Sequence, residues 1–326
     1  LIMATYKNIK GFGIQYLASD PTTSNIGQVW FNSTSKTLKG TTAGGATSGT
    51  WASGGNLPVA RQQSFGFGTQ NACLTAGGEG PGYGYNNATL LYNGSSWSIS
   101  PATLNTGRNS GAGFGVQTAG IVTGGYDPLT GKAESWDGSA WTEVADLATA
   151  RANLTGFGTQ TAGLITGGSP QQSQTETWNG SAWSEVSELN TARTGLASSS
   201  NSPYTSGLAF GGGSPGPSAV TETWNGSTWT EVADLNTARQ SLMGTGSSSS
   251  SALAFGGTSS PAGLTESWNG SSWSEVADLG TPRREAQKGS GTADVAICVG
   301  GNALPATAAT EEWTTAATVT KTFTVS

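Results

Sequence analysis

The sequence predicts an all-β protein, a six-bladed β-propeller with a small N-terminal extension that contains a hairpin. The first observation is a recurring Leu-x-x-x-Arg motif, whose arginines are Arg61, Arg108, Arg151, Arg193, Arg239 and Arg283. The second is a Gly-Gly pair that ends an apolar run in every copy. A period of about 44 residues is too long for ankyrin or tetratricopeptide repeats and lies near the length of a propeller blade.

Aromatic residues compensate for the low aliphatic content of this chain. It has 12 Trp and 50 Gly among 326 residues, and only 10% of its residues are charged. Large aromatic side chains bury ~150–250 Å² each, so a Trp-rich chain builds a core with few aliphatic residues. Glycines that recur in phase with the repeat indicate tight turns and close contacts between blades.

One copy of the repeat, residues 151–189, contains four strand-like runs and no helical one. Residues 150–158 are small and suit the crowded centre of a propeller, and residues 161–168 form the most apolar run. The last two runs lie within residues 175–186, on either side of an Asn-Gly that is typical of a tight hairpin turn. Each repeat is therefore expected to form four antiparallel strands.

The repeat resembles the kelch repeat. Kelch repeats have a Gly-Gly after the second strand, then an aromatic residue, a Trp, and a Met or Leu four residues before an Arg. A full copy here has Trp178, Trp183, Leu189, Arg193 and Gly211-Gly212. The resemblance covers residues 50–315, with a shorter hairpin, and it implies the fold without indicating a function.

Two strands are candidates for completing the last blade. Trp51 precedes Arg61 by the same interval that separates Trp141 from Arg151, so the Trp51 strand is one candidate. Alternatively, residues 319–325 supply the strand, and residues 26–55 lie outside the ring. Either strand removes an open sheet edge.

The first 48 residues fall outside the repeat. A hairpin is expected within residues 27–39, and a lone hairpin is marginal in water unless it packs on something. We therefore expect Trp30 and Phe31 to lie against the propeller or a partner chain. The predicted organisation is an attachment or assembly segment, 1–48, followed by the β-propeller, 49–326.

Most catalytic chemistry is excluded by composition. The chain has no His, which removes the usual general base and His-ligated metals. Its two cysteines, Cys73 and Cys298, make no disulfide framework and are expected to be free thiols. We expect no enzyme activity, no catalytic residue, no metal and no cofactor. A glycosidase-like propeller stays open as an alternative, because that type of enzyme is six-bladed and uses several arginines.

The charge pattern argues against nucleic acid as a partner. The chain has 14 basic and 20 acidic residues, a net charge of −6, and no basic run. No apolar stretch approaches the ~20 residues that span a bilayer, and the first residues lack the apolar core of a signal peptide. We therefore expect neither nucleic-acid binding nor membrane insertion.

The six arginines have two interpretations. In the first, each pairs with an acid of the repeat and locks the blades together; the candidates are Glu134, Glu176, Glu222, Glu266, Glu311, Asp146, Glu188, Asp234 and Asp278. In the second, some arginines line an axial site for an anion or a sugar. Arg61 and Arg108 are then the candidates, because Leu90 replaces the repeat glutamate in the first blade.

The loops after Gly-Gly differ in length and composition, whereas the turns within residues 66–70 and 156–160 are near copies. In a four-stranded meander the variable loops share one end with the arginines, and variable loops on a rigid scaffold usually carry binding. Aromatic and amide side chains suit stacking on sugars and recognition of hydroxyl groups. The candidate binding residues are Tyr83, Tyr85, Asn86, Asn87, Tyr126, Asp127, Gln171, Gln172, Arg61 and Arg108.

Both termini resemble virion proteins of marine tailed bacteriophages. The matching N-terminal residues are Asp20-Pro21, Gly27 to Asn32 and Leu38-Lys39-Gly40, and the C-terminal ones are Glu311 to Thr314 and Thr320 to Ser326. The resemblance implies a protein of the virion, assembled in the host cytoplasm, that is homo-oligomeric or present in several copies among other virion subunits.

Together these features predict a non-enzymatic phage virion protein. We expect an exposed tail-fibre or appendage component that binds host surface glycans or another receptor. The alternative is a purely structural propeller that docks another virion subunit.

Overall fold

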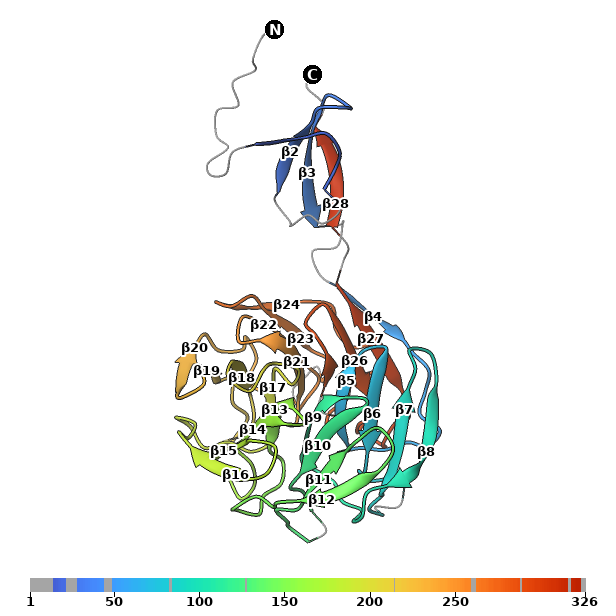
Figure 1. Ribbon diagram of the computed structural model, residues 1–326, viewed down its shortest axis with the longest axis vertical. Helices are drawn as coiled ribbons and strands as arrows, with labels where there is room; N and C mark the ends of the chain where they lie inside the picture. Colours follow the sequence, from blue (N-terminus) through green and yellow to red (C-terminus); the bar gives the residue numbers. More distant parts are fainter. Residues whose placement is uncertain are drawn as a thin grey trace. The chain divides into compact units, whose positions relative to one another are not determined.

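The computed structural model describes residues 14–21, 28–43, 49–81, 84–126, 128–213, 215–258, 262–287, 289–315 and 318–323. The chain divides into two compact units, the first with residues 1–48 and 316–326 and the second with residues 49–315. The described residues form seven four-stranded β-sheets and no helix, so the protein is all-β and its second unit is propeller-like (Figure 1). Accordingly, no helix in this part of the chain could cross a membrane.

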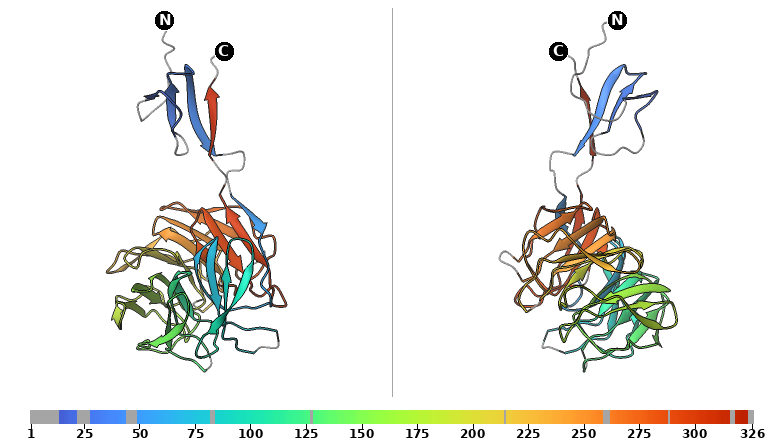
Figure 2. Two further views of the ribbon diagram at one scale, coloured as in Figure 1. Left: turned by 45° about the vertical axis from the view of Figure 1, so that its right-hand side comes forward. Right: turned by 90° about the vertical axis from the view of Figure 1, so that its left-hand side faces the viewer.

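The first unit is one sheet with the strand order β1-β2-β3-β28. Its strands are β1 (Gln15–Leu17), β2 (Val29–Asn32), β3 (Thr37–Ala43) and β28 (Thr318–Phe323). The β1–β2 pair is parallel, and the other two pairs are antiparallel. Strand β28 lies beside β3, so the two ends of the chain share one sheet (Figure 2). The second unit therefore ends at Thr315, earlier than the boundary at residue 326 expected for the propeller.

Asp20 joins two strands of this small sheet. Its carboxylate accepts hydrogen bonds from Trp30 Nε1 at 3.1 Å, Asn32 Nδ2 at 2.7 Å and Lys39 Nζ at 2.6 Å. These bonds, above all the one from Lys39, lower the pKa of Asp20 to about 2. Trp30 is fully buried, with its indole bonded inside its own unit.

The second unit contains six antiparallel sheets of four strands each. The first strands are β5 (Phe65–Thr69), β9 (Ala112–Val116), β13 (Thr155–Thr159), β17 (Ala197–Ser198), β21 (Met243–Ser248) and β25 (Ser290–Gly291). The second strands are β6 (Ala72–Ala76), β10 (Ala119–Thr123), β14 (Ala162–Thr166), β18 (Gly207–Phe210), β22 (Ser251–Phe255) and β26 (Val295–Val299). The third strands are β7 (Ala88–Tyr92), β11 (Ala133–Trp136), β15 (Thr175–Trp178), β19 (Thr221–Trp224), β23 (Thr265–Trp268) and β27 (Thr310–Thr314). The fourth strands are β8 (Trp97–Thr103), β12 (Trp141–Val144), β16 (Trp183–Val186), β20 (Trp229–Val232), β24 (Trp273–Glu275) and β4 (Thr50–Ser53).

The first strands lie toward the centre of this unit and the fourth strands at its outside (Figure 1). Each first strand packs against the first strand of the next sheet, and β25 packs against β5. Glycines make this close approach possible. A Cβ atom on Gly244 in β21 would lie 2.8 Å from Ser198 O in β17, the first strand of the preceding sheet, a distance that Cβ atoms do not reach.

Tryptophans of the fourth strands bond to the preceding sheet. Trp229 Nε1 donates to Thr175 Oγ1 at 3.1 Å. The same bond from a fourth-strand Trp to a third-strand Thr is made by Trp51, Trp97, Trp141 and Trp273. At the remaining junction Ala133 occupies the threonine position, and Trp183 donates instead to Ala145 O at 3.0 Å.

Strand β4 is the fourth strand of the last sheet, where Trp51 lies opposite Trp313. Strand β28 pairs with β3 of the first unit. Of the two candidates that the sequence left open, the Trp51 strand is therefore the one that completes the last sheet. Gly301 N donates to Arg61 O at 2.8 Å, which links the last sheet to the first.

A series of backbone hydrogen bonds connects the six sheets near their first strands. Each member lies two residues after a repeat arginine, has φ between 53° and 63°, and donates its N–H to the equivalent residue of the preceding sheet. The members are Gln63, Ser110, Asn153, Gly195, Ser241 and Glu285. Because Gln63 N donates to Glu285 O, the series returns to its start. These residues border a cavity of about 20 Å³.

Candidate binding face

The second unit has two distinct ends. The loops between second and third strands emerge at one end, the variable-loop end, where Val299 lies opposite Thr310 in the last sheet. The tight turns, such as the one at Asn179-Gly180, lie at the other, the hairpin-turn end. Thr314 and its partner Thr50 are at the hairpin-turn end. Both connections to the first unit therefore leave the second unit at the end opposite to the variable loops.

The turns between third and fourth strands, at the hairpin-turn end, are nearly uniform. The side-chain Oδ1 of Asn179 accepts hydrogen bonds from the N–H groups of Ser181 and Ala182, both at 2.9 Å. Asn93, Asp137, Asn225 and Asn269 make the same pair of bonds in their own turns. Backbone hydrogen bonds, first that from Ala140, lower the pKa of Asp137. The asparagines are thus explained by turn geometry.

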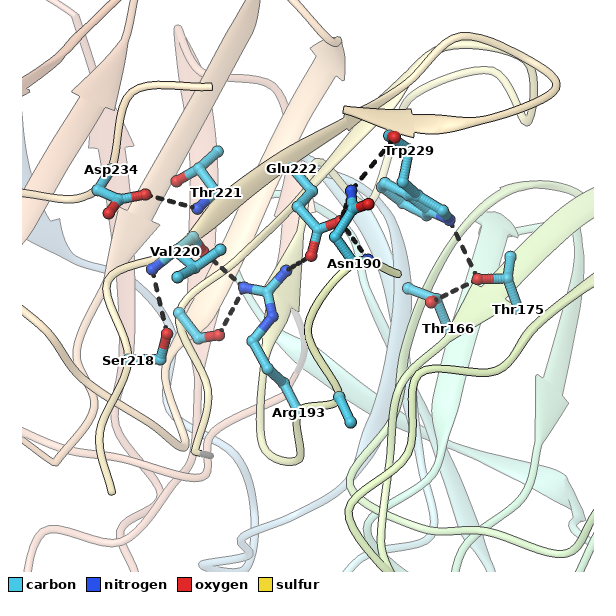
Figure 3. A network of polar contacts seen from close by, with 12 residues as sticks. Thr166, Thr175, Asn190, Arg193, Ser218, Val220, Thr221, Glu222, Trp229 and Asp234 are labelled. Atoms are coloured by element: carbon cyan, nitrogen blue, oxygen red, sulfur yellow. Dashed lines mark hydrogen bonds and ion pairs between the residues drawn. The ribbon is translucent and has the colours of Figure 1, made fainter. Parts of the chain in front are cut away.

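Arg193 shows what the repeat arginine does (Figure 3). Its Nη1 donates to Gly211 O at 2.9 Å and to Val220 O at 2.5 Å, the two ends of the loop between β18 and β19. Its Nη2 donates to Glu222 Oε1 at 3.0 Å. The other carboxylate oxygen of Glu222 accepts two bonds, both at 2.8 Å, from Asn190 N and Nδ2. Arg193 therefore clasps the base of a variable loop, and Glu222 fixes Arg193 to the connection between sheets.

Four other arginines bond both ends of the loop in their own sheet, as Arg193 does; they are Arg61, Arg108, Arg151 and Arg239. Five arginines pair with third-strand glutamates, as the first interpretation predicted: Arg108–Glu134, Arg151–Glu176, Arg193–Glu222, Arg239–Glu266 and Arg283–Glu311. The carboxylates of Asp146, Asp234 and Asp278 accept backbone N–H groups instead.

The arginines do not line an axial anion or sugar site. Each has at most 3% of its surface exposed, so the second interpretation is wrong. Burial is the largest influence on Arg151, Arg193 and Arg239 and lowers their pKa values, although the paired glutamates act in the opposite direction. The expectation that Arg108 lacks a carboxylate is also wrong, because Arg108 belongs to the second sheet and pairs with Glu134.

The first sheet departs from this arrangement at two linked positions. Leu90, which is 1% exposed, stands in the place of the glutamate. Pro58 stands where Asn190 N donates to Glu222, and proline has no N–H to donate. Arg61 keeps its bonds to Gly77 O at 3.2 Å and Ala88 O at 3.3 Å, the two ends of its loop. Burial lowers the pKa of Arg61 to about 10.

The last sheet departs in the opposite way. Arg283 pairs with Glu311 at 3.1 Å, but its Nε donates to Cys298 Sγ at 3.2 Å, and its Nη1 has no partner within the described ranges. Among the described residues it makes no hydrogen bond to either end of the loop between β26 and β27. We call a clasp complete when the arginine bonds both ends of its loop and also a third-strand glutamate. Among the described residues, the first sheet lacks the glutamate partner, although Arg61 bonds both loop ends. The last sheet has the glutamate partner but lacks the bonds from Arg283 to the loop ends.

These two loops border a groove at the variable-loop end. The groove has a volume of about 340 Å³ and is lined by Gln62, Gly80, Pro81, Asn302, Leu304, Pro305 and Ala306. A second groove, of about 520 Å³, lies on the other side of the β26–β27 loop and includes Arg284. Leu304 borders both grooves, is 82% exposed, and has a φ of 58°.

The described loop residues that were predicted to bind ligand fall into two groups, one on the loop of the first sheet and one on the loops of the second and third sheets. Tyr85 is 48% exposed, and Asn86 and Asn87 follow it on the loop of the first sheet. On the second and third sheets, the Tyr126 hydroxyl donates to Ser169 Oγ at 3.2 Å, Gln171 Nε2 donates to Ala192 O at 3.2 Å, and the Gln172 side chain is half-buried. Tyr83 and Asp127 lie outside the described residues.

The sequence did not single out the lining of the groove between the first and last sheets. Pro81 and Leu304 have neither an aromatic nor an amide side chain, and Gln62 lies outside the variable loops. Two features of the sequence could have indicated the groove: the prolines of the two loops, Pro81 and Pro305, and the expected neighbouring positions of the first and last sheets.

Cys73 and Cys298 are buried free thiols, as predicted, and burial raises the pKa of both. In the described part of the chain, no group of three His, Cys, Asp or Glu side chains is placed to hold a metal ion. No protein-family model matches this chain, and no curated protein matches it.

Proposed function

We propose that this chain is a non-enzymatic virion protein, an exposed tail-fibre or appendage component whose variable-loop end binds a host surface glycan. One observation carries the proposal. Both connections to the first unit leave at the hairpin-turn end, whereas the loops that differ in length and composition lie at the opposite end. A protein attached through its first unit would thus keep the variable-loop end available for binding. The virion setting is supported by the resemblance of both termini to phage virion proteins.

We also propose that the second unit is a closed, six-bladed, kelch-like propeller. Support comes from the six sheets of equal strand order, from the packing of β25 on β5, and from the hydrogen-bond series that returns to Gln63. A closed ring holds the base of every loop in a fixed place.

The first unit is the proposed attachment or assembly module, shared by residues 1–48 and 316–326. A single shallow glycan site binds weakly, so adhesion requires several copies of the protein. This requirement fits a homo-oligomer or a multicopy component that contacts other virion subunits.

A binding role fits the acidic residues better than a glycosidase role does. The repeat glutamates are at most 5% exposed, and each is paired with an arginine. Their carboxylates therefore stabilise the loops, which supports a non-catalytic role for them.

The test compares exposed tyrosines at the two ends. Tyr85 is 48% exposed at the variable-loop end, and Tyr204 is 39% exposed at the hairpin-turn end. The full chain is screened on a glycan array, and the variants Tyr85→Ala and Tyr204→Ala are then titrated with the selected glycan. We expect weaker binding by Tyr85→Ala and unchanged binding by Tyr204→Ala. An equal loss in both variants, or no glycan bound by the unaltered protein, contradicts the proposal; the latter result favours the docking alternative.

A further inference from the structure

We propose that the groove between the first and last sheets is the ligand site, and that it takes a neutral saccharide. This inference rests on the proposed function and adds to it a site and a ligand class. Its basis is the juxtaposition of Gln62 and Pro81 with Asn302, Leu304 and Pro305 across one groove.

The size and lining of the groove suit a sugar. Its volume of about 340 Å³ lies within the range of small-ligand pockets, which is ~300–1,000 Å³. Pro81, Leu304 and Pro305 offer an apolar wall for the C–H face of a sugar ring. Gln62 and Asn302 contribute amide groups, which both donate and accept hydrogen bonds and so match hydroxyl groups. Within the described part of the chain each amide makes one bond, from Gln62 Nε2 to Glu79 and from Leu304 N to Asn302 Oδ1.

The charge near the groove disfavours an acidic ligand. Gln62 Nε2 donates to Glu79 Oε2 at 2.8 Å, which places a carboxylate beside the groove. No described residue that lines this groove is cationic, and Arg283 and Arg284 line the neighbouring groove instead. The chain also carries a net charge of −6, which repels anions. A neutral, hydroxyl-rich ligand avoids this repulsion.

Among the residues that line the groove, Leu304 is the one whose exposure and backbone conformation contribute least to the stability of the fold. Its side chain is 82% exposed, so it adds little to the core, and its φ of 58° is unfavourable for any residue other than Gly or Asn. Local departures of this kind concentrate at functional sites. Contact with a ligand gives the exposed leucine a function that folding does not.

The two loops that form the groove are the ones without a complete clasp. Among the residues that the structure describes, Arg61 has no glutamate partner, and Arg283 bonds Cys298 rather than the loop ends. A loop base with fewer bonds to its arginine and glutamate opens at lower free energy, and the loop adjusts to a ligand more readily. The two loops with an incomplete clasp thus belong to neighbouring sheets, and they border the same groove.

The experiment substitutes one exposed leucine in each of two loops at the variable-loop end. Leu304→Asn removes the apolar contact and relieves the backbone, because Asn tolerates a positive φ. Leu129→Asn is the matched control, since Leu129 is 37% exposed on the loop of the second sheet. The full chain and both variants are tested on an array of neutral and acidic glycans, and the selected glycan is titrated by calorimetry.

We expect the unaltered chain to select a neutral glycan. Leu304→Asn should weaken binding about tenfold or more without lowering the melting temperature, and Leu129→Asn should bind as the unaltered chain does. Unchanged binding by Leu304→Asn overturns the site while the proposed function stands. Selection of acidic glycans overturns the ligand class. If no glycan binds, the proposed function fails and this inference fails with it.

Discussion

The first and fourth sheets of the second unit have the same strand order but hold their arginines differently. In the fourth sheet, Arg193 bonds both ends of the loop and pairs with Glu222, which in turn accepts the N–H of Asn190. In the first sheet, Leu90 and Pro58 remove the carboxylate and the N–H donor together. Arg61 remains and still bonds the loop ends. The difference shows that the arginine clasps the loop, and that the glutamate joins this clasp to the connection between sheets.

The two sheets also differ in the energetics of a buried charge. Burying a guanidinium costs solvation energy, and a paired carboxylate offsets much of that cost. Arg61 has no carboxylate partner in the described part of the chain, and burial lowers its pKa to about 10. Breaking the pair in the fourth sheet should therefore be costly, whereas the first sheet is already adapted to its absence.

The largest effect is expected from Glu222→Leu, which imposes the first-sheet residue on the fourth sheet. The substitution leaves Arg193 buried without a counter-charge and Asn190 N without an acceptor, so the free energy of unfolding should fall by about 3–5 kcal/mol. Urea unfolding measures the change. The double variant Arg193→Met/Glu222→Leu removes both charges and should recover most of the loss. A double variant as unstable as the single one contradicts the pairing energetics.

A smaller effect is expected from Arg61→Met. This change breaks the bonds to Gly77 O and Ala88 O but leaves no carboxylate unpaired, so the loss should stay below about 2 kcal/mol. Arg193→Met is the matched variant and should cost more, because it leaves Glu222 buried without its partner. Equal losses for the two variants, measured by the same urea unfolding, would show that the paired glutamate does not make Arg193 more important for stability than Arg61.

Ala133→Thr extends the comparison to the junction between the second and third sheets. It supplies the hydroxyl group that accepts the indole N–H at the other junctions, so Trp183 should move from Ala145 O to the new threonine. A gain of about 0.5–1.5 kcal/mol in the free energy of unfolding is expected. Thermal unfolding measures the gain, and a chemical-shift change of the Trp183 indole N–H reports the new bond. A destabilised variant in which that signal does not move would contradict the prediction.

The smallest effect concerns Asp20, a carboxylate that gathers three donors as an exposed counterpart of Glu222. Its pKa is lowered from 3.8 to about 2, so its stabilising contribution is complete above pH 4 and is lost as the pH falls toward 2. The Trp30 indole N–H signal should shift over this range in the unaltered chain and stay constant over it in Asp20→Asn. If the Trp30 indole signal responds to acid in the same way in both proteins, protonation of Asp20 is not what changes the environment of Trp30.

Repeated features were predictable from sequence, and unrepeated ones were not. In-phase Gly-Gly pairs and Trp51 predicted the strands and the completion of the last sheet, because each copy confirms the others. The pairing of β28 with β3 has no repeat to reveal it and depends on contacts between the two ends of the chain. The partner of Arg108 was misassigned because an arginine that follows the fourth strand of one sheet belongs to the next.

The groove between the first and last sheets was not predictable for a related reason. It depends on which loops lack a complete clasp, and that requires the bonding partners of Arg61 and Arg283 rather than their positions. Leu304 has no polar or aromatic character that marks a binding residue, and its backbone conformation is visible only in the structure.

The central claim is that the bonds of the repeat arginine and its glutamate determine which variable loops open most readily. Hydrogen–deuterium exchange of the full chain tests this claim most directly. Six equivalent amides close the loop bases by donating to the residue at the far end of the loop; they belong to Gly77, Gly124, Gly167, Gly211, Gly256 and Gly300. We predict that Gly77 and Gly300, in the sheets without a complete clasp, exchange faster than the other four. Equal rates at all six, or the slowest exchange at Gly77 or Gly300, would contradict the claim.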